Sequence, residues 1–320
     1  MKITTPRVGI AAAASAALLL TACSSSTSDD GAIGDPALTV AAAFYPLQFV
    51  AERVGGDDVS LISLTPPGVE AHDVELSPAT VRELGTADLA LYLSDFQPAV
   101  DDAISTTGIA SLDAASVIAL HEAEEHAEGD EDDHDHDHEG EDHADEHDHG
   151  DSDPHFWLDP HLLAELAGSV AESFGEADPD NAATYSANAD ALVGELEALD
   201  ESFATGLAQC ERDTIVVSHE AFGYLTEAYG LHQEGLAGLD PDTEPSPARL
   251  LEIQDIIAET GVTTIFTESI VSTSVAEALA ADVGVETAVL DPVENVTDGD
   301  DYIDVMTRNL AALQAALGCA

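Results

Sequence analysis

Three histidines and one aspartate lie where an α/β protein gathers the side chains that do its chemistry. His72 follows an apolar, strand-like segment and a Pro-Pro-Gly turn, and His219 comes directly after another such segment. Asp291 follows the last of these segments, and His155 lies in the turn-rich sequence Asp-Pro-His-Phe-Trp-Leu-Asp-Pro. Because ligand groups collect at the carboxyl ends of strands in open α/β sheets, we expect the four side chains to converge on one point.

This set of side chains suits a transition-metal ion. Three neutral imidazoles and one carboxylate match the four ligands that zinc accepts, whereas calcium and magnesium sites are built from oxygen atoms. Taken singly, each histidine is explained equally well as a metal ligand or as a surface or hydrogen-bonded core residue without a function. The joint pattern is what favours a metal site.

Most of the other histidines fall in a low-complexity segment. Eight of the 13 histidines lie between residues 121 and 150, where almost every residue is His, Asp, Glu, Gly or Ala. We expect a disordered loop over 121–152 that gathers or senses metal, and the alternative is a merely solvated insert. The auxiliary candidates in it are His134, His136, His138, His143, His147 and His149. His161 and His232 are left out of the site.

The charge balance excludes one class of partner. The chain carries 65 acidic and 7 basic residues, for a formal net charge of -58. Nucleic acid is not an expected partner, because the chain offers no basic surface for phosphates. We interpret the acidity first as a solvated surface, and a field of this sign also raises the local concentration of divalent cations.

Residues 1–22 have the form of an export signal. Lys2 and Arg7 precede an apolar stretch that is too short for a membrane span, and small residues lead to Leu-Thr-Ala-Cys23. This sequence resembles a bacterial lipobox, which predicts cleavage before Cys23 and a lipid on its sulfur. A polar tether over 23–36 would follow. An ordinary secretory signal with an incidental cysteine is the alternative.

The remaining cysteines are expected to form a disulfide. If Cys23 is lipidated, Cys210 and Cys319 are left, an even number in an oxidising compartment. Such a bridge would tie the end of the chain to the start of its second half. Two free buried thiols are the alternative.

Apolar periodicity predicts two α/β lobes with a long helix between them. Strand-like and helix-like segments alternate, which is the pattern of a parallel sheet. The expected strands cover 38–44, 59–64, 87–93, 214–218, 262–266 and 287–290, and the expected helices begin at Ser77-Pro78 and cover 221–229, 248–260, 274–283 and 303–317. Apolar residues at three- and four-residue steps after Asp178-Pro179 predict one helix of about 30 residues. The predicted organisation is a lobe over 37–177, a linking helix over 178–209 and a second lobe over 210–320.

Four ordered motifs give the sequence a resemblance to a known family. They are Pro66-Pro-Gly-Val-Glu-Ala-His72-Asp-Val-Glu-Leu-Ser-Pro78, Asp153-Pro-His155-Phe-Trp-Leu-Asp-Pro160, Ser218-His219-Glu-Ala-Phe-Gly-Tyr224 and Leu290-Asp291-Pro292, with Glu244-Pro-Ser-Pro247 and Phe266-Thr-Glu268 agreeing nearby. The chain resembles the zinc and manganese substrate-binding lipoproteins of ABC importers. The resemblance implies two α/β lobes with parallel or mixed sheets, one long rigid helix joining them, and a metal ion in the cleft between the lobes.

The resemblance also implies the ligands and the metal. The ligand set becomes His72, His155, His219 and Asp291. Members that look manganese-specific tend to have Glu at the position of His219, so the third imidazole favours zinc. The last motif continues Pro292-Val-Glu-Asn, without the glycine more usual there, and this departure leaves Glu70 or water as the alternative fourth ligand. Copper or nickel would also bind such a set tightly, because affinity follows the Irving–Williams order.

The function that this resemblance implies is capture rather than catalysis. The chain is expected to bind zinc outside the cytoplasm and deliver it to the permease and ATPase of an ABC importer. We expect a monomer, held by its lipid to the outer face of a bacterial cell membrane. A manganese-binding or other divalent-metal-binding member of the family and a metal-dependent surface adhesin are the alternatives. A secreted zinc hydrolase is disfavoured, because no HExxH or comparable box positions Glu220 or Glu268 as a general base.

Overall fold

The computed structural model describes residues 36–122, 152–269, 273–296 and 299–320. The chain divides into two units, Met1–Gly34 and Asp35–Ala320, and the fold below is that of the second. The predictions for the export signal, for Cys23 and for the six loop histidines therefore lie outside the described residues. Among the described helices, none combines the length and the apolar character needed to cross a membrane.

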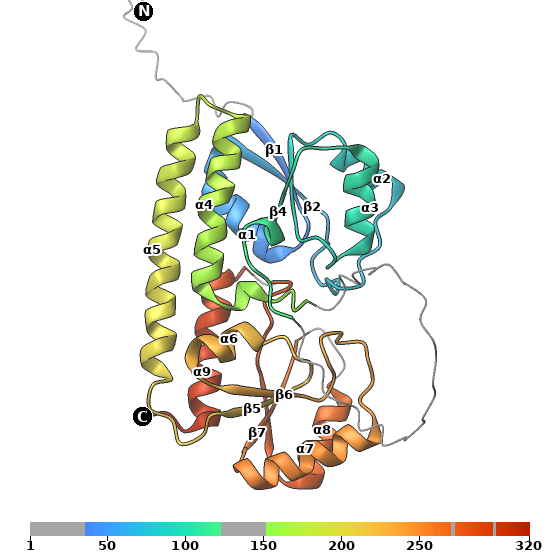
Figure 1. The fold of residues 1–320 in the computed structure, drawn as a ribbon, viewed down its shortest axis with the longest axis vertical. Helices are drawn as coiled ribbons and strands as arrows, with labels where there is room; N and C mark the ends of the chain where they lie inside the picture. Colours follow the sequence, from blue (N-terminus) through green and yellow to red (C-terminus); the bar gives the residue numbers. More distant parts are fainter. Residues whose placement is uncertain (1–35, 123–151, 270–272, 297–298) are drawn as a thin grey trace, which may run out of the picture. The chain divides into compact units, whose positions relative to one another are not determined.

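The N-terminal lobe is built on a parallel sheet in the order β2-β1-β3-β4 (Figure 1). Its strands are β1 (Leu38–Ala42), β2 (Val59–Ser63), β3 (Leu89–Tyr92) and β4 (Ser111–Asp113), and its helices are α1 (Tyr45–Gly55), α2 (Pro78–Leu84) and α3 (Pro98–Thr107). In the register, Val40 of β1 lies between Leu61 and Leu89. The central strand is buried on both faces, which explains its continuous apolar run. The predicted start of α2 is confirmed: Ser77 accepts a hydrogen bond from the backbone N–H of Thr80, and proline occupies the first turn.

The C-terminal lobe repeats this plan with a parallel sheet in the order β6-β5-β7-β8. Its strands are β5 (Thr214–Val217), β6 (His232–Gly235), β7 (Thr264–Thr267) and β8 (Glu286–Val289), and its helices are α6 (Gly223–Tyr229), α7 (Pro247–Thr260), α8 (Ser274–Val283) and α9 (Tyr302–Leu317). Both sheets are wholly parallel, so the expected α/β class is correct and the mixed alternative is not needed.

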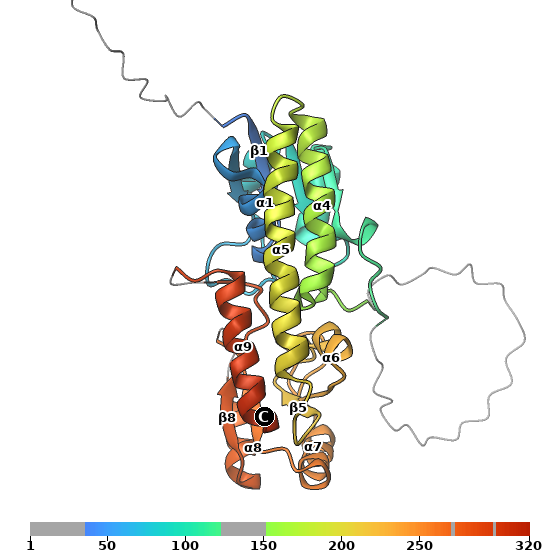
Figure 2. The ribbon, with the colours of Figure 1, turned by 90° about the vertical axis from the view of Figure 1, so that its left-hand side faces the viewer.

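Two long helices, α4 (Pro160–Ala177) and α5 (Ala182–Gly206), run side by side, and α5 continues past α4 to pack against α9 (Figure 2). One apolar core joins the first sheet, α4, α5 and α9. A smaller one lies in the C-terminal lobe and contains Val216 and Ile265 of the sheet with Ile253 and Leu279 of the helices. Since α5 contributes to the shared core along its length, it holds the two lobes together.

The predicted start of the linking helix at Asp178 is wrong. Residue 178 ends α4, and its carboxylate accepts hydrogen bonds from Asn181 and from the hydroxyl of Tyr185 at 2.8 Å. Asp178-Pro179 therefore closes one helix and sets the turn before the next, so α5 begins at Ala182 and has 25 residues. The apolar spacing that predicted the helix is nevertheless its buried face, which includes Tyr185, Leu192 and Phe203.

A disulfide joins Cys210 to Cys319 across 109 residues, as the cysteine count predicted. The bridge fixes the end of α9 to the segment that follows α5. Backbone hydrogen bonds accompany it, from Ala320 to Gln209 and from Glu211 and Arg212 to Leu317.

The double variant Cys210→Ser/Cys319→Ser should unfold with a free energy about 2–4 kcal/mol lower than the wild type, because its unfolded chain is less constrained. Denaturant titration of both proteins measures the difference. Reduced wild type should match the variant, and equal stability of the oxidised protein and the variant would contradict the expectation.

Candidate metal centre

Four side chains meet between the lobes: His72, His155, His219 and Glu294. One ligand atom from each lies within 4.8 Å of all the others. The Nε2 atoms of His155 and His219 are 3.5 Å apart, and Glu294 Oε1 lies 3.2 Å from the first and 3.8 Å from the second. Metal–ligand bonds of about 2.0–2.1 Å in a tetrahedron place neighbouring ligand atoms about 3.3 Å apart. The spacing of the four groups therefore fits a zinc-sized ion.

Each of these side chains comes from a loop at the edge where strands end. His72 lies between β2 and α2, His219 follows β5, and Glu294 lies between β8 and α9. His155 precedes the short 3-10 helix Phe156–Leu158 that leads into α4. The rings of His155 and His219 are almost fully buried, whereas the side chain of His72 keeps 15 % of its surface exposed. His72 is thus the ligand nearest to solvent.

Two buried histidines are oriented by carboxylates behind them. Asp153 Oδ1 lies 2.7 Å from His155 Nδ1, and it also accepts the backbone N–H of His155. Glu268 Oε1 lies 2.6 Å from His219 Nδ1 and accepts the hydroxyl of Ser218. A carboxylate on Nδ1 favours the tautomer with the proton on that atom, which leaves Nε2 free to bind a metal. The ring of His72 is instead held edge-on against Phe96, with centroids 4.7 Å apart.

The electrostatics of the centre favour a cation. Burial alone opposes a charged Glu294, but hydrogen bonds and charge interactions with His155 and His72 outweigh it and hold the pKa of this carboxyl well below its usual range. Burial likewise opposes a charged His155, yet hydrogen bonds to Asp153 and Glu294 outweigh it and raise the pKa of His155 to about 9. A proton on His155 and a divalent ion are therefore alternatives at this position.

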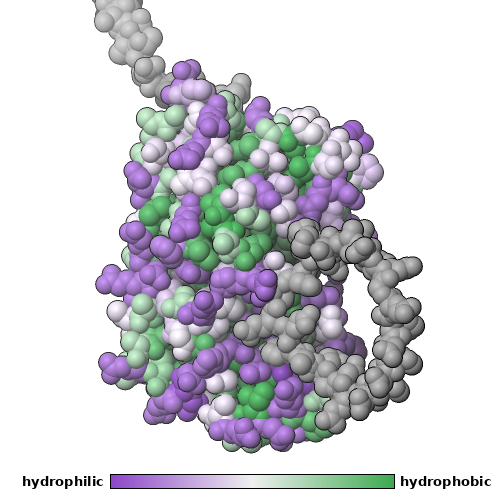
Figure 3. Space-filling model, viewed as in Figure 1, coloured by the Kyte–Doolittle hydropathy of each residue, from purple (hydrophilic) through white to green (hydrophobic). Residues whose placement is uncertain are grey.

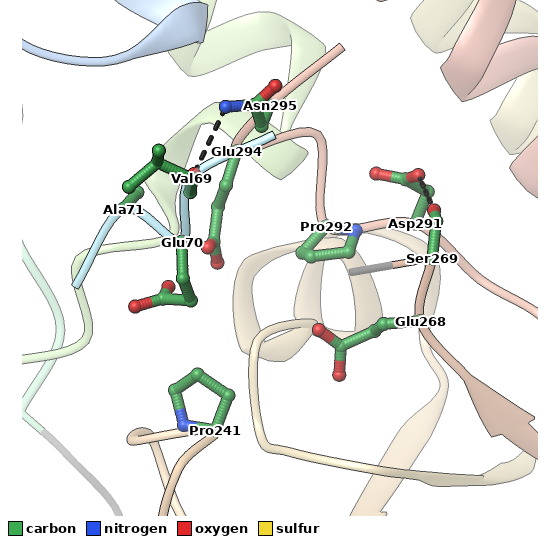
Figure 4. A pocket seen from close by; sticks show the side chains of 10 residues that line it. All are labelled: Val69, Glu70, Ala71, Pro241, Glu268, Ser269, Asp291, Pro292, Glu294 and Asn295. Atoms are coloured by element: carbon green, nitrogen blue, oxygen red, sulfur yellow. Dashed lines mark hydrogen bonds between the residues drawn. The ribbon is translucent and has the colours of Figure 1, made fainter. Parts of the chain in front are cut away.

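Asp291, the expected fourth ligand, is not among the four converging groups. Its carboxylate accepts the hydroxyl of Ser269 at 2.5 Å and the backbone N–H of Val293 at 2.8 Å, and burial raises its pKa. Glu70, Glu268, Glu294 and Asp291 all line the pocket next to the centre, and Asp291 turns toward Ser269 (Figure 4). The structure thus offers Glu294 in place of Asp291.

The physical reason lies in the turn after Asp291. Val293 has a φ of 59°, in the left-handed region that β-branched residues rarely adopt, and its N–H is held by the Asp291 carboxylate. The indole of Trp157 donates to the carbonyl of Pro292 at 2.7 Å, which fixes the other side of the turn. The chain therefore reverses before Glu294, and Asp291 supports the turn that carries this carboxylate to the histidines. A second acid three residues after the aspartate was the sequence signal for it.

Glu70, the alternative fourth ligand, also lies outside the converging group. Its two carboxylate oxygens accept the backbone N–H groups of His72 and Asp73, at 2.9 and 3.0 Å. It therefore shapes the loop that carries His72. His161 and His232 are both exposed and belong to other parts of the surface.

The carboxylates considered as bases for a hydrolase have other partners. Glu268 is hydrogen bonded to His219 and Ser218, as described above. Glu220 lies 3.6 Å from the guanidinium of Arg249 and accepts the backbone N–H of Gly235 at 3.4 Å. Four side-chain ligands complete a tetrahedral shell, and catalytic zinc needs an open position.

The fold and the site define a two-lobed α/β protein with a metal centre between its lobes. A family model described as the zinc-uptake complex component A, periplasmic, matches residues 40–316. The chain therefore belongs to this family.

Individual relatives agree with this assignment. The chain is 33% identical over 289 residues to the zinc-binding lipoprotein AdcA of Streptococcus pneumoniae serotype 4, covering 88% of this chain but only 56% of that protein. It is 34% identical to the high-affinity zinc uptake system protein ZnuA of Bacillus subtilis, with 88% of each chain covered. The solved structure of the laminin-binding protein Lmb of Streptococcus agalactiae, described as having adhesin and metal-transporting activity, matches with a TM-score of 0.75 at 29% identity. That match covers 88% of this chain and 99% of Lmb.

Loss of a residue that hydrogen bonds to a metal ligand typically weakens metal binding roughly 10–100-fold. Glu294→Gln should weaken zinc binding by more than this, because it removes a charged ligand. Asp291→Asn should weaken binding less, since an amide oxygen can still accept from Val293. Competition titration against a chelator measures both, with Glu201→Gln on the exposed face of α5 as the control. Stronger damage from Asp291→Asn than from Glu294→Gln would reverse the assignment of the fourth ligand.

Zinc affinity should fall as the pH is lowered from about 8 to about 6, because the metal needs neutral imidazoles. The pKa of His155 is raised to about 9, so this ring holds a proton throughout that range and must release it on binding. Each displaced proton lowers the apparent affinity about tenfold per pH unit. Titration at several pH values, with proton release followed in weak buffer, tests this. Affinity independent of pH would exclude the proposed ligands.

Proposed function

We propose that this protein captures zinc outside the cytoplasm and delivers it to the permease and ATPase of an ABC importer. The observation that carries the proposal is the convergence of His72, His155, His219 and Glu294 at separations that suit one four-coordinate ion. The ion is cargo rather than a cofactor, and the protein performs no chemistry on it. Membership of the zinc-uptake complex component A family supports this role.

Zinc is the favoured cargo because of the donor atoms. Three imidazoles and one carboxylate suit a borderline-soft ion with four ligands, whereas manganese prefers sites richer in oxygen and often with more ligands. Buried Asp153 and Glu268 hold a proton on Nδ1 of two imidazoles, so that Nε2 is the atom that faces the ion. The named zinc proteins AdcA and ZnuA support the same choice.

The membrane anchor and the partners are part of the proposal. Lipidation of Cys23 and location on the outer face of the cell membrane are supported by the sequence pattern and by a relative that is named a lipoprotein. Action as a monomer is proposed together with them. The chain spans about half the length of that relative, at 56% coverage. The visible face of the molecule is largely hydrophilic, interrupted by smaller apolar areas (Figure 3), as suits a protein surrounded by water.

Adhesion is a second candidate, favoured by the structural similarity to Lmb. Surface adhesion and metal capture use different parts of a molecule, so both activities are compatible with one fold. Binding of the zinc-loaded chain to immobilised laminin, measured against the Glu294→Gln variant, distinguishes a metal-dependent adhesin from a transport protein alone.

The histidine-rich segment is proposed to gather metal for the tight site. Its ends are paired: Glu122 forms a bridge with Ser152, and the N–H of Asp153 donates to the carbonyl of His121. Asp153 is also the carboxylate that orients His155. A deletion that respects this pairing therefore removes 123–151 and leaves both ends in place.

The variant that lacks residues 123–151 should keep one tight zinc site and lose only weak additional binding. Isothermal titration with zinc and with manganese measures stoichiometry and affinity, and zinc should bind more tightly by at least about tenfold, following the order of divalent-ion affinities. The full chain is the control. Tighter manganese binding would overturn the choice of metal, and loss of the tight site on deletion would overturn the site.

A further inference from the structure

Asn295 links the two lobes beside the metal centre. Its side-chain oxygen accepts the backbone N–H of Gly68 at 2.9 Å, and its amide nitrogen donates to the carbonyls of Pro66 and Val69, both at 3.1 Å. The residue follows β8 in the C-terminal lobe, while its partners follow β2 in the N-terminal lobe. Only 8 % of Asn295 is exposed, so these hydrogen bonds are largely shielded from water. Figure 4 shows the bond to Val69 directly above Glu294.

Both segments that Asn295 joins carry metal-binding groups. On one side, Glu294 is its neighbour in the chain. On the other side, the segment with Gly68 and Val69 continues through Glu70 to His72. His72 Nε2 lies 3.4 Å from Glu294 Oε1, so the two loops meet at the ion position as well as at Asn295. Parting of the two loops therefore separates these two ligands and breaks the hydrogen bonds of Asn295.

We infer that Asn295 acts as a clasp that slows release of the bound metal. It is a positioning residue: it does not touch the ion but holds the loops of His72 and Glu294 together. This inference rests on the proposed function, since it concerns the same site and the same cargo. The clasp acts mainly on the rate of release, because its bonds must open before the loops part, and most affinity changes within one binding site appear in that rate.

The chemistry of the amide makes the inference specific. One oxygen faces an N–H donor and one NH₂ group faces two carbonyls, so the side chain is matched to three backbone partners at once. Asn295→Ala removes all three bonds. Asn295→Asp keeps the shape and the acceptor for Gly68 but places an oxygen against the carbonyls of Pro66 and Val69, which is repulsive.

The test is the rate at which zinc leaves the protein after mixing with excess chelator, followed by stopped flow. Asn295→Ala should release zinc about tenfold faster, and Asn295→Asp faster still, while the association rate changes much less. Asn188→Ala is the matched control: its half-buried amide donates to the carbonyl of Val54 at 2.9 Å, between α5 and α1, and its loss should leave release unchanged.

Thermal unfolding of each metal-free variant identifies any that fail to fold, and the isosteric Asn295→Asp then carries the test. If both Asn295 variants bind zinc tightly and release it at the wild-type rate, the clasp is refuted and the proposed function stands. A wild-type chain that binds no zinc would overturn the proposed function itself. If Asn295→Ala slows association by the same factor as it speeds release, the whole site is distorted, and this result also refutes the clasp.

Discussion

The structure depends on the burial of a carboxylate among three imidazoles. An isolated buried Glu294 would be costly, and it is stabilised by His72 and His155 at 3.4 and 3.2 Å. The carboxylates of Asp153 and Glu294 also raise the pKa of His155 to about 9, so the same surroundings favour a positive charge on this ring. Asp153 and Glu268 extend this organisation by fixing the rings from behind. Metal binding then exchanges a proton for a divalent ion in a site whose ligands are already in place.

The fold brings these groups together because each lobe contains the same kind of parallel sheet. Each lobe has a parallel sheet whose strands end at the space between the lobes, and His72, His219 and Glu294 all follow strand ends. The lobes cannot separate freely, because α5 contributes to one continuous core that also includes the first sheet and α9. Change at the site is therefore expected in the loops, where Val293 adopts an unfavourable backbone conformation and Asn295 bridges the lobes. We therefore expect loading and release to involve these loops more than the packing of the two lobes.

The sequence predicted correctly those strands and helix starts that depend on neighbouring residues in the chain. Continuous apolar runs identified β1, β3 and β5, and Ser77-Pro78 identified the start of α2. It missed the edge strands β4 and β6, whose short sequences Ser-Leu-Asp and His-Gln-Glu-Gly contain few apolar residues. It also placed the start of α5 at Asp178, since a carboxylate followed by proline looks like a helix start whether or not the chain is ending another helix. The first error concerns the neighbouring strand in the sheet, and the second concerns the helix that ends at Asp178.

Periodicity in the sequence predicted the class of fold, and the placement of three histidines in motifs that resemble a known family predicted the imidazoles of the site. The pairing of Cys210 with Cys319 was predicted once Cys23 was assigned to a lipid, and the structure contains this disulfide. Only the tertiary structure decided which carboxylate joins the histidines. Asp291 and Glu294 are three residues apart and chemically alike, and the choice between them depends on the turn at Val293, held by Trp157 from another segment. The local sequence offers both acids but does not choose between them, because the backbone reversal that presents Glu294 is stabilised by contacts with a distant segment.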